Sequence, residues 1–258
     1  MAKKTTRKKA AAPKKKKVAV PWQPSAALVF RARAILRRLV KAHPDWGPTL
    51  EFTTPFELLV ATILAAQAQD EHINRVTRRL FVKYRRPADY VAVPVTELEV
   101  DVHETGFFRM KAKAIRTASE QLLAEFGGEV PGTMEDLVRL RGVGRKTASI
   151  VLGNAFGVPA VAVDRHVARV ADRLRLVGAK GKDATEFSLR ALYQKKDWVK
   201  ATWCLVLHGR RICTPTPKCW VCPINDLCPY PKKTTDPDAP ALRRMLPRRA
   251  SPRPSRSR

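Results

Sequence analysis

The chain has 258 residues, and its 50 lysines and arginines against 23 acidic residues give a formal net charge of +27. A hydrophobic content of 45% excludes a wholly disordered chain, and the length allows one domain or two small ones. No apolar run approaches the roughly 20 residues that cross a bilayer, and no secretory signal follows the basic N-terminus, so we expect no membrane partner. The charge instead favours a polyanionic partner, with nucleic acid ahead of anionic lipid.

Both ends of the chain are rich in basic residues. Residues 1–17 contain nine Lys or Arg and no acid, and residues 232–258 contain nine more against two aspartates. Ala, Pro and Ser make up much of the remainder, and such a composition cannot build a core. We therefore predict disordered basic tails over residues 1–21 and 231–258. They are either solvated tails or segments that add affinity for nucleic acid without sequence preference.

Between the tails, apolar residues recur at helical spacing and almost no stretch alternates as a strand does. Thr54, Pro55 and Glu57 have the pattern of a capping box with a first-turn proline, and the apolar helix that follows should be the buried central one. In chain order, helices are predicted over residues 25–42, 54–64, 71–84, 109–126, 133–139, 145–156, 164–176, 184–195 and 196–212. The fold class is therefore predicted to be all-α.

A glycine-rich turn separates two of these helices. Gly142 and Gly144 flank Val143, so the backbone can come close to a neighbouring molecule. Amides of the turn and of the next helix start would converge at the positive helix end, which suits a DNA phosphate and ignores base sequence. On its own, Gly-x-Gly is weak evidence and favours an ordinary turn between helices.

Two charged residues after this turn are candidates for catalysis. A lone lysine is usually a solvated charge, but Lys146 lies at a helix N-terminus, where partial desolvation would favour the uncharged, nucleophilic amine. Asp164 precedes the next helix and should act as its N-cap. A carboxylate there could also stabilise positive charge on a sugar while a glycosidic bond breaks.

Four of the five cysteines fall within sixteen residues near the C-terminus. Cys213, Cys219, Cys222 and Cys228 are spaced C-x5-C-x2-C-x5-C. Four thiolates can hold either a structural zinc ion or a [4Fe–4S] cluster, and the residues alone leave both open. The fifth, Cys204, is expected to be a small core residue.

Several motifs in family order resemble the endonuclease III family of DNA base-excision glycosylases, which carry a helix-hairpin-helix, a Gly/Pro-Asp motif and an iron–sulfur cluster. The resemblance extends from about residue 25 to residue 230. The segments that carry it are Phe56-Glu57-Leu58-Leu59, Ala66-Gln67-Ala68-x-Asp70, Gly128-Glu129-Val130-Pro131, Leu140-x-Gly142-Val143-Gly144-Arg145-Lys146-Thr147-Ala148, Ala162-Val163-Asp164-x-His166-Val167, His208-Gly209-Arg210 and the cysteines.

The resemblance implies roles for the matching residues. Lys146 falls on the family's nucleophile and Asp164 on its catalytic carboxylate. Gln67 matches a glutamine that fills the gap left by an extruded base. Phe107 stands at the apolar wedge, where the family usually has Leu, although a core aromatic is an equal reading of this residue. The hairpin contacts to DNA fall on Gly142, Val143, Gly144 and Arg145.

The resemblance also implies a cofactor, an activity and an architecture. The four cysteines would hold a [4Fe–4S] cluster, although their first gap is one residue shorter than usual. The protein would be a bifunctional glycosylase and abasic-site lyase that removes oxidised pyrimidines from double-stranded DNA and nicks the strand by β-elimination through a lysine Schiff base. A six-helix barrel (48–158) and a cluster domain (22–47 and 159–230) would enclose the DNA cleft.

Two rival functions remain at this point. A monofunctional glycosylase would share the hairpin, aspartate and cluster but lack the lysine, and a non-catalytic DNA clamp would use only the hairpin and tails. We expect a monomer. Its location would be the bacterial cytoplasm in association with the nucleoid, or the nucleus or an organelle if the source is eukaryotic.

Overall fold

The computed structural model describes residues 22–239, so the tail predictions for 1–21 and 240–258 fall outside it. Every regular element in the described part is a helix, which confirms the all-α fold class. The α-helices are α1 (Ala26–Ala42), α2 (Pro55–Leu64), α3 (Asp70–Lys83), α4 (Pro87–Ala92), α5 (Val95–Asp101), α6 (Phe108–Phe126), α7 (Met134–Leu137), α8 (Arg145–Ala155), α9 (Arg165–Arg173), α10 (Lys182–Leu192) and α11 (Trp198–Arg211), with short 3-10 helices η1 (His103–Thr105), η2 (Lys195–Asp197) and η3 (Cys219–Val221).

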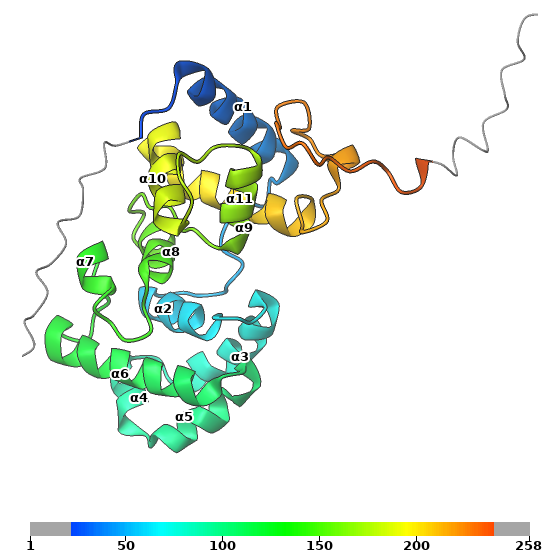
Figure 1. Cartoon of the computed structure of the whole chain (residues 1–258). Helices are drawn as coiled ribbons and strands as arrows, with labels where there is room; N and C mark the ends of the chain where they lie inside the picture. Colours follow the sequence, from blue (N-terminus) through cyan, green and yellow to red (C-terminus); the bar gives the residue numbers. More distant parts are fainter. Residues whose placement is uncertain (1–21, 240–258) are drawn as a thin grey trace, which may run out of the picture.

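The helices form two lobes with separate hydrophobic cores. One core uses buried residues between Leu50 and Ala160, and the other uses residues 32–39 together with residues 161–224. In Figure 1, α1, α9, α10 and α11 gather in one half of the molecule and α2 to α6 in the other, with α8 between them. The chain therefore crosses from one lobe to the other just before α9, next to Asp164.

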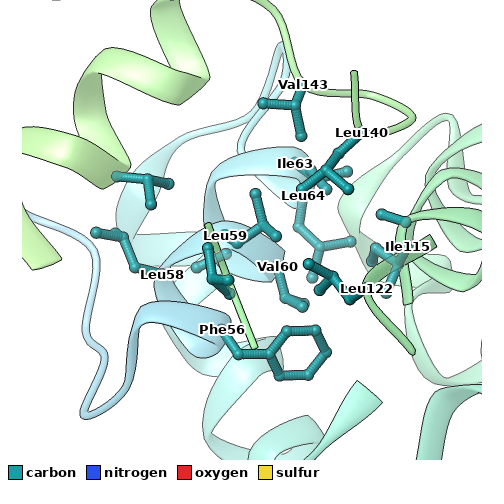
Figure 2. Close-up of a cluster of buried hydrophobic side chains, with 14 of the residues drawn as sticks. Phe56, Leu58, Leu59, Val60, Ile63, Leu64, Ile115, Leu122, Leu140 and Val143 are labelled. Carbon is teal, nitrogen blue, oxygen red and sulfur yellow. The ribbon is translucent and has the colours of Figure 1, made fainter. Parts of the chain in front are cut away.

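Helix α2 is the centre of the larger core. The side chain of Thr54 accepts a hydrogen bond from the Glu57 amide, and the Glu57 carboxylate accepts one from the Thr54 amide, so the predicted capping box is present. Every residue from Leu58 to Leu64 is buried. Figure 2 shows this helix packed against Ile115 and Leu122 of α6 and against Leu140 and Val143 of the glycine-rich turn. The central helix thus fixes the turn next to the second lobe.

Two short helices between residues 85 and 102 were missed by the sequence prediction. Pro87 is in the first turn of α4, and the Asp89 carboxylate accepts hydrogen bonds from the amides of Arg85 and Arg86. Pro94 caps α5 in the same region. Pro87 follows the predicted helix over residues 71–84, and a proline at a first helical position is a start signal as well as a stop for the helix before it.

The first residues of the predicted C-terminal tail contact the cysteine segment. The Thr234 hydroxyl donates to the Pro217 carbonyl and accepts from the Cys219 amide, while the Lys233 amine donates to the Asn225 carbonyl. These contacts tie residues 233 and 234 to the loop between the cysteines.

No helix within residues 22–239 combines the length and apolar character that a membrane crossing requires.

Candidate active site and cysteine cluster

A cleft of about 740 Å³ opens between the two lobes and is lined by both. Gln67, Lys146 and Asp164, three of the predicted site residues, line it together. They come from the turn after α2, the start of α8 and the start of α9, which are distant in sequence. A large concave site with converging polar groups is the usual form of an active site.

Lys146 is the second residue of α8, directly after the glycine-rich turn. Its side chain is exposed in the free protein, as the usual reading of a lone lysine has it. The side chain is exposed because the start of α8 faces the open cleft rather than a core. Any desolvation of the amine therefore has to come from a molecule that occupies the cleft.

Asp164 is the N-cap of α9, as predicted. Its Oδ1 accepts hydrogen bonds of 2.8 Å from the amides of His166 and Val167. Its Oδ2 makes no hydrogen bond within residues 22–239, and the half-buried side chain lines the cleft. One oxygen therefore orients the carboxylate and the other remains available to a ligand.

His166 is held beside this aspartate in a basic environment. Burial lowers the pKa of His166, and the neighbouring Arg169 and Arg165 lower it further against the opposing effect of Asp164. Burial and the flanking arginines therefore favour the neutral imidazole at this position.

The glycine-rich turn is braced against α6. The Gln121 side chain accepts a hydrogen bond of 2.7 Å from the Arg141 amide and donates to the Arg139 carbonyl. Val143 is buried, whereas Gly142 and Gly144 are exposed. The amides of Gly142 and Gly144 donate no backbone hydrogen bond within the described residues. The turn therefore presents free amides at the positive end of α8, where an anion would be stabilised.

The two glycines of the turn should respond differently to alanine. Gly142 has φ +82°, and a Cβ there would lie 3.0 Å from the Ala114 Cβ, while Gly144 has φ −98° and open space. Gly142→Ala should lower the free energy of unfolding by about 1–3 kcal/mol, and Gly144→Ala by less than about 1 kcal/mol. Urea denaturation measures both, and equal losses would contradict the described turn geometry.

Gln67 and Phe107 share a rare backbone conformation. Their φ values are +58° and +50°, and Arg175 is the one other non-glycine residue with positive φ in the described chain. Strained backbone of this kind concentrates at functional sites. The Phe107 side chain is 63% exposed, so the alternative reading of a core aromatic is wrong. Unlike Gln67, Phe107 does not line the cleft itself.

Two ion pairs join the lobes, and neither was foreseen from the sequence. Arg145 of α8 binds the buried Glu186 of α10 at 2.7 Å, and Arg210 of α11 binds Asp70 of α3 at 2.8 Å. The Arg145 guanidinium, expected on DNA, is thus engaged by a carboxylate in the free protein. Asp70 and Arg210 belong to two of the family motifs noted above, but nothing in either motif showed that they pair.

The four cysteines of the C-terminal segment surround a second, small cavity. Cys213, Cys219, Cys222 and Cys228 all line it, and none of them forms a disulfide. Among the described residues no three His, Cys, Asp or Glu side chains are arranged to hold one metal ion. Cys204 is fully buried in the core, as predicted.

The thiols are partly buried, and basic side chains line the cavity with them. Burial raises the pKa of Cys222 to about 11 and also raises the pKa of Cys213, which the hydrogen bond from Arg173 partly opposes. The Arg173 guanidinium lies 3.3 Å from the Cys213 Sγ and also donates to the Thr214 and Pro215 carbonyls. Arg173 therefore orders the short first gap of the cysteine motif.

Comparison with known proteins agrees with these features. The model of the HhH-GPD superfamily of base excision DNA repair proteins matches residues 60–195. Endonuclease III of Bacillus subtilis is 46% identical over 183 residues, which are 69% of this chain and 83% of the relative. Endonuclease III of Synechocystis sp. is 43% identical over 77% of this chain and 92% of its own length.

A solved structure extends the similarity to the fold. The trapped endonuclease III–DNA covalent intermediate in an estranged-adenine complex has a TM-score of 0.76 and 39% identity, and covers 84% of this chain and 99% of its own. The superfamily match spans the hairpin, Lys146 and Asp164. The chain belongs to the HhH-GPD superfamily of base-excision DNA repair proteins and, within it, to the endonuclease III family.

Proposed function

We propose that this base-excision glycosylase is bifunctional. It removes oxidised pyrimidines from double-stranded DNA and then cuts the strand as an abasic-site lyase through a Schiff base on Lys146. One observation carries the proposal: Lys146 and Asp164, at the starts of two different helices, line the same cleft between the lobes. This pairs a nucleophile with a carboxylate, which base removal by an amine requires.

Base removal proceeds by attack of the uncharged Lys146 amine on the anomeric carbon of the damaged nucleotide. The glycosidic bond breaks, and the base leaves with the electron pair of that bond and takes up a proton. Asp164, which lines the cleft and uses only Oδ1 for its capping hydrogen bonds, stabilises the positive charge that develops on the sugar. Because the anomeric carbon is hidden in a duplex, the nucleotide must first be flipped out.

Strand cleavage follows from the covalent sugar–lysine intermediate. Opening of the sugar ring gives the protonated imine, which makes the neighbouring C2′ proton acidic. Loss of that proton expels the 3′ phosphate as the leaving group, and water then hydrolyses the imine and regenerates Lys146. Electrons and atoms balance without an oxidant or a reductant.

Binding of the duplex would use the parts of the surface around the cleft. The free amides of Gly142 and Gly144, next to Val143 and Arg145, suit a backbone phosphate. Gln67 at the cleft and the exposed Phe107 would enter the base stack, as apolar wedges do in bent DNA. Arg145 would exchange part of its pairing with Glu186 for phosphate.

A [4Fe–4S] cluster fits the cysteine cavity. Its four free thiols share one cavity, and each iron of a cluster takes one thiolate, so the sulfurs need not converge on a single ion. The ligands would be Cys213, Cys219, Cys222 and Cys228. When bound, the cluster supplies a structural clamp for the C-terminal segment. Arg173 compensates thiolate charge at Cys213.

Iron content distinguishes this cluster from structural zinc. We expect the purified protein to be brown and to contain about four irons per chain, whereas a zinc protein is colourless. Cys222→Ser should lose most of the iron and the colour, while Cys204→Ser, in the core, should keep both. Zinc in place of iron in the wild-type protein would contradict the assignment.

A panel of duplexes with single lesions tests the proposed activity. Duplexes carrying thymine glycol, dihydrouracil, uracil or an abasic site are scored separately for base loss and for nicking. We expect base loss and nicking with the oxidised pyrimidines, and nicking of the abasic duplex. Base loss without nicking would indicate a monofunctional glycosylase, and affinity without either reaction would indicate a DNA clamp.

We further propose that the enzyme works as a monomer in the bacterial cytoplasm, associated with the nucleoid. One chain supplies both candidate catalytic residues to a single cleft. The similar endonuclease III proteins come from bacteria. The basic tails, with their excess of positive charge, would add affinity for DNA of any sequence.

A further inference from the structure

The segment that presents Phe107 has an unusual backbone. Gly106 and Phe107 have φ values of +69° and +50°, so the chain passes through two consecutive residues with positive φ before α6 begins. Phe107 is the N-cap of α6, a position that is normally extended. Non-glycine residues adopt this conformation only when the surroundings hold them there.

Lys111 lies one turn into α6, directly behind this segment. Its side chain is only 5% exposed, and its Nζ donates a hydrogen bond of 2.7 Å to the Thr105 carbonyl. No carboxylate pairs with it among residues 22–239, and burial lowers the pKa of the amine. Burial costs the charged amine its hydration, and the positive end of the helix repels it. Packing alone therefore does not explain why Lys111 is buried here.

A second basic side chain holds the preceding carbonyl. The Nε2 atom of His72, on α3, lies 2.7 Å from the Glu104 carbonyl oxygen and donates to it. The Arg75 guanidinium lies 2.8 Å from the other ring nitrogen of His72 and fixes the ring. Two successive carbonyls, of Glu104 and Thr105, are thus held from α3 and from α6.

We propose that Lys111 is a positioning residue for the Phe107 wedge. With His72, it forms a clamp on the carbonyls of Glu104 and Thr105 that keeps Gly106 and Phe107 in the left-handed region and the phenyl ring extended into solvent. The inference rests on the proposed function, because it takes Phe107 to enter the DNA base stack. Lys111 itself touches neither DNA nor the reacting atoms.

The clamp explains why an exposed aromatic does not fold back onto the protein. Phe107 is 63% exposed, although apolar packing would favour its collapse onto neighbouring surface. A ring held outward before DNA arrives loses less conformational freedom on insertion. An apolar side chain of similar length at residue 111 would remove the hydrogen bond to the Thr105 carbonyl without opening a large cavity.

The test uses the full chain and a duplex with 2-aminopurine opposite a tetrahydrofuran abasic analogue. Insertion of the wedge unstacks the 2-aminopurine and raises its fluorescence, and no chemistry is needed. At saturating protein, Lys111→Met should give a fluorescence rise about threefold smaller than wild type, and slow single-turnover base removal about tenfold. Lys113→Met, which removes a neighbouring exposed lysine from the same helix, serves as the matched control and should equal wild type.

A double-variant cycle separates positioning from a general loss of structure. Phe107→Ala should itself abolish most of the fluorescence rise, and adding Lys111→Met to it should change base removal less than about twofold. A Lys111→Met protein with wild-type fluorescence, or with an undiminished effect in the Phe107→Ala background, would overturn the proposal.

Three further outcomes are decisive. If Lys111→Met does not melt cooperatively, His72→Leu at the more exposed side of the clamp decides: we expect an about twofold smaller fluorescence rise, and wild-type behaviour overturns the clamp. If wild type and Phe107→Ala give the same fluorescence, the wedge assignment fails and the clamp with it. If those two differ and only the Lys111 and His72 variants match wild type, the clamp fails alone and the proposed function stands.

Discussion

Replacement of Asp164 by Asn should slow the removal of an oxidised base by about a thousandfold and leave the free energy of unfolding nearly unchanged. The carboxylate charge opposes the positive charge that develops on the sugar, and loss of such a preorganised group is costly in a site that excludes water. Asn caps a helix as well as Asp does, so the hydrogen bonds to the His166 and Val167 amides can be kept. Single-turnover base release and urea denaturation measure the two effects.

Asp164→Ala provides the comparison for the capping role. Its rate of base removal should fall to a similar degree. Its free energy of unfolding should also fall by about 1 kcal/mol, because both helix-capping hydrogen bonds disappear. Nicking of a preformed abasic site should suffer less in both variants, since no glycosidic bond remains to break. If Asp164→Asn removed bases at the wild-type rate, Asp164 would serve only as the N-cap of α9.

Much of the fold could be predicted because local signals agreed with the tertiary structure. The capping box at Thr54 and Glu57 and the apolar residues after it identified the central helix, and both are present. The helices α4 and α5 were missed because each is short and begins at a proline, in a stretch with little helical periodicity. A six- or seven-residue helix offers too few turns for a periodic pattern to show.

The candidate site was predictable residue by residue but not as an arrangement. The family motifs identified Lys146 and Asp164, and the structure places them in one cleft with Gln67. The exposure of Lys146 could not be read from the sequence, because it depends on which way the start of α8 faces. The Arg145–Glu186 and Arg210–Asp70 pairs join residues more than 40 positions apart, and no local pattern records such contacts.

Replacement of Lys146 by Ala should abolish strand cleavage and lower base removal by about ten-thousandfold or more. The amine is the nucleophile in both steps, and the other lysine that lines the cleft, Lys182, begins α10 in the second lobe. The variant should still bind a duplex with a tetrahydrofuran site, since the hairpin and wedge contacts do not depend on the amine. Folding should be unaffected, because the side chain is exposed at the second position of α8.

Lys182 supplies the matched control. It is also an exposed lysine that lines the cleft, but it begins α10 in the other lobe. Lys182→Ala should keep nicking of abasic duplexes, with at most weaker DNA binding from the loss of one charge. Equal loss of nicking in both variants would show that the cleft needs positive charge rather than one nucleophile.

Trapping of the covalent intermediate tests the central claim most directly. The wild-type chain is incubated with an oxidised-pyrimidine duplex and borohydride, which reduces the imine, and the adduct is digested and mapped by mass spectrometry. We expect one sugar-modified residue, Lys146, and no adduct from Lys146→Ala. An adduct on another residue, or none from an enzyme that still nicks the strand, would contradict the lyase mechanism.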